Sequence, residues 1–146
     1  MNDHNYWKSL EWPAAPNEAD VEIFKGYCLG RVLLLGSTKL LLPIATEAWD
    51  LYPLYNDPKL KQRDWFSLNE RFDTIILDGG LSFSEQFCKD LLNLVLPNCN
   101  RFIARCFLNP NWPTKYAVYF PKAEELIPSP EEHPISEVYT FYIWNN

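Results

Sequence analysis

The sequence predicts an α/β fold in which helices cover both faces of a mostly parallel sheet. One observation is a continuous aliphatic run at residues 31–35, which is typical of a central strand buried on both faces. Another is that helix-like segments alternate with strand-like runs as far as residue 108. The third is size, because 146 residues of which 47% are hydrophobic suffice for a substantial core. We therefore expect a single domain over residues 1–146.

The N-terminal part is expected to form an arm followed by a helix. Residues 1–16 are rich in aromatic residues and proline and should form an extended arm. Asn17 is a favourable helix cap, and apolar residues at helical spacing follow it up to Gly30, where the helix should end. The arm and the helix together should lie across one edge or the mouth of the sheet.

The middle of the chain is expected to supply most of the sheet. After the first strand, Gly36 allows a tight turn, and the hydroxyl residues next to it can cap a helix over residues 39–45. Ser84 should cap a second helix, which ends just before Pro97. Further strands are expected at residues 48–51, 62–66, 72–77 and 101–108.

The C-terminal part of the sequence is less regular. Residues 121–134 contain four prolines and four glutamates. Residues 138–144 alternate aromatic and aliphatic side chains and should form a final, antiparallel strand.

Composition narrows the classes of partner. The net charge of −6 and the pI of about 4.9 disfavour nucleic acid, and no apolar run approaches the roughly 20 residues of a membrane span. The polar start does not have the build of a secretory signal. Four cysteines without a Cys-x-x-Cys pair favour free thiols in the cytoplasm, and two histidines leave little material for a metal site.

Small and acidic residues stand where the predicted strands end, and ligands of open α/β sheets bind at that edge. Gly36, with Ser37 and Thr38, offers backbone that a ligand can approach closely. Asp50 at the end of the next strand is placed to accept two hydrogen bonds from ribose hydroxyls. Its alternative role is that of a solvated turn acid.

Two further strand ends complete a predicted adenosine pocket. Asp64 can hold an exocyclic amine while Trp65 stacks on a purine, although the same residues equally suit a loop cap and a core side chain. Asp78, followed by Gly79 and a second glycine, is an acid at the mouth of a buried strand. We expect Asp78 and Gly79 to line the site.

In their order and spacing these residues resemble class I S-adenosylmethionine-dependent methyltransferases. The resemblance covers roughly residues 31–108. The stretches that resemble the motifs of the family are residues 32–36, 48–53, 64–65, 72–80 and 101–107.

The resemblance implies a three-layer, Rossmann-like methyltransferase fold and S-adenosyl-L-methionine as the cofactor. It also implies transfer of the sulfonium methyl group to a small molecule, or to an acceptor that a protein partner presents. Such chemistry depends mainly on positioning and desolvation. Asp78 is the candidate catalytic residue, which accepts a proton or orients an amine. Exposed aromatic residues also allow a homodimer.

The sequence departs from the family pattern in two places. Gly36 is the only glycine of the first motif, and the hydroxyls of Ser37 and Thr38 can replace glycine amides as donors to the methionine carboxylate. The segment after the fifth strand is too short for the usual helix, so we expect an abbreviated C-terminal half. These departures support two alternatives: a non-catalytic binding or regulatory subunit, and an enzyme that uses the same cofactor for another reaction.

Three residues are candidates for contact with the substrate. Tyr6 and Trp7 can form an aromatic lid, or can simply pack their rings on the sheet. Arg105 can anchor a substrate carboxylate, although its place in an apolar strand also suits a structural role.

Overall fold

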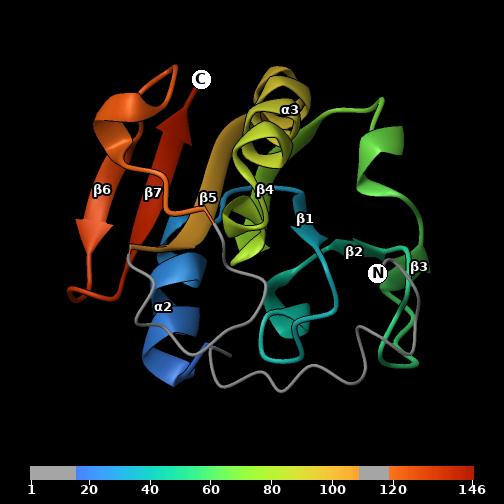
Figure 1. Ribbon diagram of the computed structural model, residues 1–146. Helices are drawn as coiled ribbons and strands as arrows, with labels where there is room; N and C mark the ends of the chain where they lie inside the picture. Colours follow the sequence, from blue (N-terminus) through green and yellow to red (C-terminus); the bar gives the residue numbers. More distant parts are fainter. Residues whose placement is uncertain (1–15, 109–118) are drawn as a thin grey trace.

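A computed structural model describes residues 16–108 and 119–146, which form a seven-stranded sheet in the order β3-β2-β1-β4-β5-β7-β6 (Figure 1). Strands β1 to β5 run parallel, and β7 runs antiparallel to both β5 and β6. The mostly parallel sheet with an antiparallel C-terminal strand is therefore confirmed. The strands are β1 Val32–Leu35, β2 Glu47–Asp50, β3 Leu60–Gln62, β4 Phe72–Asp78, β5 Cys99–Phe107, β6 Glu131–Pro134 and β7 Tyr139–Asn145.

Among the described residues, each face of the sheet packs against one α-helix. Side chains alternate along a strand, so Leu33 of β1 belongs to one buried cluster and Leu34 to the other. Helix α3, Glu85–Val95, contributes its apolar side to the first cluster, and helix α2, Glu18–Tyr27, contributes Phe24 to the second. The molecule is thus three layers thick, and α2 covers a face of the sheet.

The helix caps act as the sequence predicts. The Asn17 side chain accepts a hydrogen bond from the Asp20 amide (2.9 Å), and the Asp20 carboxylate accepts one from the Asn17 amide (3.1 Å). Ser84 Oγ accepts from the amide of Phe87 at the start of α3 (3.0 Å). Gly30 lies beyond the end of α2 with φ +60°, a value that favours glycine.

Two elements differ from the sequence prediction. The helix expected at residues 39–45 is only a 3₁₀ turn, Leu42–Ile44, because Pro43 lacks the amide proton that a longer helix requires. The third strand, expected at residues 62–66, is instead Leu60–Gln62, and the two ranges share only Gln62. Asp64 then accepts a hydrogen bond from the Phe66 amide (3.0 Å) and caps a 3₁₀ turn, Trp65–Ser67.

The C-terminal half completes the sheet but adds little helix. Strand β6 was not predicted, because it lies at an edge of the sheet and its mostly exposed side chains show no apolar alternation. Among the described residues after β5, the only helical element is a 3₁₀ turn, Ala123–Glu125. The segment directly after β5, residues 109–118, where the usual helix of the family would begin, lies outside the described residues.

Residues 16–108 and 119–146 show neither a membrane-spanning helix nor a metal-binding cluster. Neither described helix has the length and apolar character needed to cross a bilayer. In the same residues, no group of three or more His, Cys, Asp or Glu side chains is arranged to hold a metal ion.

Candidate functional site

The predicted site residues from four strand ends lie at one edge of the sheet. In the parallel ladder, Leu35 pairs with both Trp49 of β2 and Leu77 of β4. Asp50 and Asp78, one residue further along their strands, therefore lie at the same carboxyl edge as the loop after β1. The order of these residues in space is the one that their order in the sequence led us to expect.

Gly36 leaves the backbone accessible at this edge, because it has no side chain. Its φ of +122° favours glycine, and its amide donates to the Trp49 carbonyl (2.8 Å). The Trp65 indole N–H donates to the same carbonyl (2.8 Å), which fixes the ring beside Gly36. A Cβ added to Gly36 would have a single close neighbour among the described residues, Trp65 Cζ2 at 3.9 Å. The backbone of Gly36 and the indole ring of Trp65 therefore lie side by side at this edge of the sheet.

Ser37 and Asp50 are joined by a side-chain hydrogen bond. Ser37 Oγ donates to Asp50 Oδ2 (2.5 Å) and accepts from the Leu54 amide (3.3 Å). Asp50 Oδ1 also accepts from the amide of Tyr52 (2.9 Å). A serine hydroxyl has one proton, and this one is used on Asp50 rather than on a cofactor carboxylate. The contact orients the carboxylate that we expect to bind ribose.

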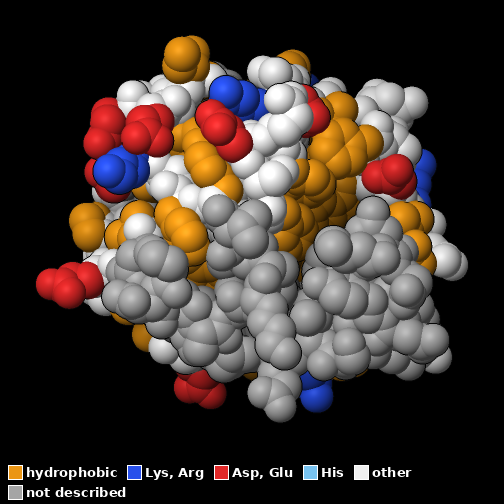
Figure 2. Space-filling model, in the orientation of Figure 1, with side chains coloured by type: hydrophobic (Ala, Val, Ile, Leu, Met, Phe, Trp, Pro, Cys, Tyr) orange, Lys and Arg blue, Asp and Glu red, His pale blue; other side chains and the backbone are white. Residues whose placement is uncertain are grey.

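The remaining residues of the predicted adenosine pocket are less enclosed. Asp64 is exposed, and Trp65 is half-buried with its ring 6.2 Å from that of Phe87. Phe66 and Phe83 also lie against Phe87, at 5.6 and 5.3 Å between ring centroids. Figure 2 shows hydrophobic side chains gathered in a hollow on the face that includes α3. The aromatic cluster occupies the connection between β3 and the start of α3.

Thr38 contributes backbone to the turn after Gly36. Its carbonyl oxygen accepts hydrogen bonds from the amides of Leu41 and Leu42, at 3.0 and 3.2 Å. The predicted capping of a helix by the side chain of Ser37 or Thr38 was wrong, because the 3₁₀ turn has no side-chain cap. Tyr6 and Trp7, the predicted lid residues, lie outside the described residues.

Asp78 and Arg105 form a buried ion pair across neighbouring strands. The two residues are paired in the β4–β5 register, and Arg105 donates from Nε to Asp78 Oδ1 (2.5 Å) and from Nη2 to Oδ2 (3.1 Å). Arg105 is only 1% exposed and Asp78 6%. This two-bonded geometry matches the planar fork of a guanidinium to a carboxylate. The Arg105 side chain is thus engaged inside the protein, at a distance from solvent.

A second carboxylate, from helix α2, completes the group. Arg105 Nη1 donates to Asp20 Oδ2 (3.2 Å), and the Tyr139 hydroxyl donates to Asp20 Oδ1 (2.9 Å). Burial acts to lower the pKa of Arg105, but Asp78 and Asp20 outweigh it and leave the pKa above its ordinary value. Burial and the bond to Asp20 raise the pKa of Tyr139. Sequence reasoning did not identify Asp20 or Tyr139, because they lie far from Arg105 in the chain.

Gly79 continues this buried group at the mouth of β4. Its φ is +81°, and its amide donates to the Arg105 carbonyl (3.0 Å). A Cβ at this position would come within 3.3 Å of the Phe107 ring. Gly79 therefore suits both the backbone conformation and the close packing of this strand end.

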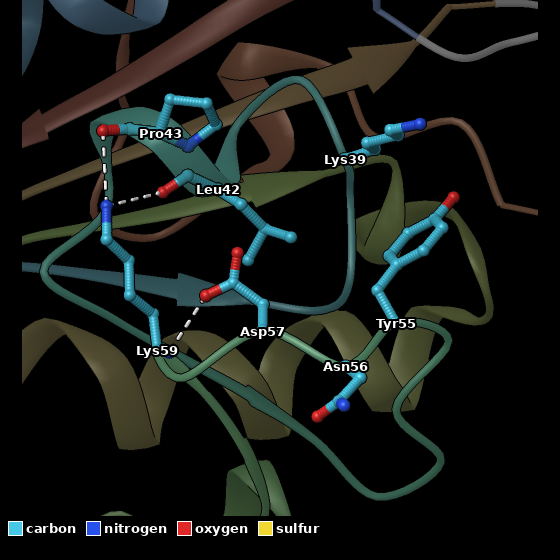
Figure 3. Close-up of a pocket in the computed structure, with 7 residues that line it drawn as sticks. All are labelled: Lys39, Leu42, Pro43, Tyr55, Asn56, Asp57 and Lys59. Atoms are coloured by element: carbon cyan, nitrogen blue, oxygen red, sulfur yellow. Dashed lines mark hydrogen bonds between the residues drawn. The ribbon is translucent and has the colours of Figure 1, made fainter.

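A separate pocket of about 290 Å³ lies beside the 3₁₀ turn Leu42–Ile44 (Figure 3). Lys59 Nζ donates to the carbonyls of Leu42 and Pro43, at 3.1 and 3.3 Å. No residue that the sequence assigned to a site lines it. Its lining residues are Lys39, Leu42, Pro43, Tyr55, Asn56, Asp57 and Lys59.

Comparisons with known proteins identify the fold. Neither a protein-family model nor a curated protein sequence matches the chain. Magnesium protoporphyrin IX methyltransferase (ChlM) from Synechocystis PCC 6803, solved with bound SAH, has a TM-score of 0.58 at 11% identity, over 84% of this chain and 80% of that chain. The same enzyme with bound SAM gives 0.53 at 14% identity, over 84% and 76%.

A third structure belongs to the same comparison. The pyocyanin biosynthetic protein PhzM has a TM-score of 0.52 at 10% identity, over 84% of this chain and 53% of that chain. Together with the sheet order, these likenesses show that the chain has the Rossmann-like fold of class I S-adenosylmethionine-dependent methyltransferases. The fold that the sequence resemblance implied is therefore confirmed.

Proposed function

We propose that the protein is an S-adenosylmethionine-dependent methyltransferase that acts on a small molecule or on an acceptor presented by a protein partner. The observation that carries this proposal is the convergence of Gly36, Asp50 and Trp65 at the carboxyl edge of the sheet. Ligands of open α/β sheets bind at this edge. ChlM, which has the same fold, was solved with SAM and with SAH bound.

The residues of this edge fit an adenosine group. The backbone at Gly36 is open to close approach, and the Trp65 ring beside it can stack on a purine. The Asp50 carboxylate, oriented by Ser37, is suited to ribose hydroxyls. Asp64, exposed after β3, is the proposed partner of the exocyclic amine. Thr38 lies where its backbone can contribute to the methionine end.

The bound cofactor would supply a sulfonium methyl group, and this chain would supply position and exclusion of water. Asp78 is the proposed catalytic residue, with Gly79 beside it. Because Arg105 donates to both carboxylate oxygens, the proposed role of Asp78 is to orient an acceptor amine rather than to take its proton. We assign Arg105 to holding Asp78, and substrate contact by Tyr6 and Trp7 stays a prediction.

The proposal is tested by isothermal titration calorimetry with S-adenosylmethionine and S-adenosylhomocysteine. Wild-type protein should bind, and Asp50→Ala should weaken binding by more than ~10-fold, the scale of a lost charge-assisted hydrogen bond. Asp57→Ala is the matched control, because Asp57 is an acid of the same β2–β3 connection whose side chain accepts from the Lys59 amide (2.9 Å). Equal affinity in both variants would remove the ribose assignment.

A second candidate function is that of a methyltransferase-like binding or regulatory subunit without catalysis. For either candidate we propose a cytoplasmic location, because the described cysteines are free thiols. The second candidate is supported by the single glycine of the first loop and by the engagement of Asp78 with Arg105. Absence of binding to the folded protein would favour this candidate. If the cofactor binds, Asp78→Asn should lower turnover with a retained affinity, and product analysis separates methyl transfer from another reaction of the same cofactor.

A further inference from the structure

Asp20 connects helix α2 to the strand end that carries Asp78. Asp20 is 2% exposed. Its carboxylate accepts hydrogen bonds from three groups: the Asn17 amide, Arg105 Nη1 and the Tyr139 hydroxyl. The first of these partners belongs to the start of the same helix, and the other two belong to β5 and β7. One side chain therefore ties the helical layer to two strands of the sheet.

This contact fixes the plane of the Arg105 guanidinium. Asp78 binds Nε and Nη2, while Asp20 binds Nη1, so the two carboxylates hold different sides of the same rigid group. The Arg105 guanidinium carbon also lies 5.0 Å from the centre of the Tyr139 ring. A buried guanidinium gains most from such planar, two-sided recognition, because its five N–H donors have a fixed geometry. Loss of one carboxylate would let the group rotate.

A backbone hydrogen bond also connects Arg105 to Gly79, at the end of β4. The Arg105 carbonyl accepts the amide of Gly79 (3.0 Å), and Gly79 has a left-handed conformation. Arg105 thus contacts both the side chain of Asp78 and the backbone of the next residue. A displacement of Arg105 would be transmitted to the two residues that we propose at the methyl-transfer end.

We propose that Asp20 is a positioning residue, which acts through Arg105 to hold Asp78 and Gly79 in place for cofactor and acceptor. This inference rests on the proposed function, and it adds a role for helix α2. Tyr139 supports Asp20 from β7. Asp20 also has a local role as the third residue of helix α2, where it completes the capping box with Asn17, and that role gives no sign of the long-range contacts.

The first test uses the full chain without ligand. Hydrogen exchange is measured at the amides of residues 78–80 in wild-type protein and in Asp20→Asn, which keeps an oxygen acceptor for the helix cap but removes the charge. We expect exchange at these amides to be about fivefold faster or more in the variant, because the strand end opens locally. Unchanged exchange in a folded variant would overturn the proposal.

Glu47→Gln is the matched control for general loss of stability. Glu47 is also buried and acidic, but it lies at the start of β2, where it pairs with Lys61 and with Arg31. Its loss should not change exchange at residues 78–80 relative to the rest of the sheet. If the control speeds exchange there as much as Asp20→Asn does, the effect is global and the proposal fails.

The second test measures affinity for S-adenosylmethionine. Asp20→Asn should weaken binding about fivefold or more at a temperature where the variant stays folded, and Glu47→Gln should stay within about twofold of wild type. Tyr139→Phe removes the hydroxyl that donates to Asp20 and keeps the charges of Asp20 and Arg105. It should change affinity and exchange in the same direction but less, and it serves if Asp20→Asn does not fold. Wild-type protein that binds neither ligand would overturn the proposed function and the cofactor part of this inference, whereas the exchange result would still decide whether Asp20 holds the strand end.

Discussion

The hydroxyl of Ser37 donates a 2.5 Å hydrogen bond to Asp50 Oδ2, and this contact ties the loop after β1 to the end of β2. The serine is buried, and the carboxylate receives a second bond from the Tyr52 amide. The acid that we propose for ribose is therefore held in one orientation. Pre-orientation of this kind lowers the entropy lost when a ligand binds.

Replacing Ser37 by alanine should weaken cofactor binding by a smaller factor than Asp50→Ala does. The variant keeps the carboxylate but removes its buried donor, so we expect an affinity loss of about 3- to 10-fold, which corresponds to one hydrogen bond. Titration calorimetry measures it. Ser129→Ala is the control, because its hydroxyl donates to the Ala123 carbonyl (3.0 Å) at an exposed position in the C-terminal part of the chain. A Ser37→Ala variant with wild-type affinity would separate the contact from binding.

Gly36→Ala should destabilise the fold even though the space beside Gly36 is open. At φ +122° an L-residue is strained, so we expect the free energy of unfolding to fall by about 1–3 kcal/mol. Gly26→Ala provides the contrast, because Gly26 is in helix α2 and none of the described residues lies within 4 Å of an added Cβ. That change should stabilise by about 0.5–1 kcal/mol. Urea titrations compare the two, and equal effects would refute the backbone argument.

Glu47 should make the protein sensitive to acid. Burial acts to raise the pKa of Glu47, but bonds from Lys61 and Trp49 outweigh it and hold the pKa below the ordinary 4.5. Its contribution is therefore complete above about pH 4.5 and is lost as the pH falls through the lower, folded-state pKa. Glu47→Gln should reduce the free energy of unfolding by about 1–3 kcal/mol at pH 7.

The pH dependence of that difference is the decisive measurement for Glu47. Unfolding followed by tryptophan fluorescence from pH 7 to pH 3 should show the wild-type and Glu47→Gln curves converging at low pH. Curves that stay parallel over this range would show that the carboxylate charge contributes nothing to stability.

The four cysteines should be unreactive in the folded protein. Burial raises the pKa of Cys28 and Cys88 to about 11, and that of Cys99 and Cys106 to about 12. Because the thiolate is the reactive form, we expect little reaction with Ellman's reagent at pH 8 and full reaction of all four thiols in denaturant. Rapid labelling of Cys88, Cys99 or Cys106 under native conditions would contradict their burial.

The elements that the sequence predicted well are those whose environment is uniform along the element. Residues 32–35 are buried on both faces and read as a continuous aliphatic run, and the cap of α2 lies within a few residues of Asn17. Edge strand β6 has mostly exposed side chains and gives no such pattern. Pro43 limits the helix expected at residues 39–45 to a single 3₁₀ turn, because proline has no amide proton to donate.

For the candidate site, the sequence predicted the positions of the residues but not the partners of their side chains. The order of strands was enough to place Gly36, Asp50 and Asp78 at one edge, because parallel strands end on the same side of a sheet. The partners of these residues depend on the register of β4 and β5 and on the way α2 packs, and neither follows from local sequence. From the sequence, Arg105 suited both a substrate contact and a structural role, and the contacts of its guanidinium with Asp78 and Asp20 support the structural role.

The two outer strands have a consequence for how copies of this chain can associate. The outer strand β3 exposes Lys61 and Gln62, and β6 exposes Glu131, Glu132 and Pro134. Charged side chains and a proline hinder the pairing of one sheet with the next to form a continuous ribbon. These outer strands therefore favour association of two copies through helices, loops or the faces of the sheet over association by pairing of strand edges.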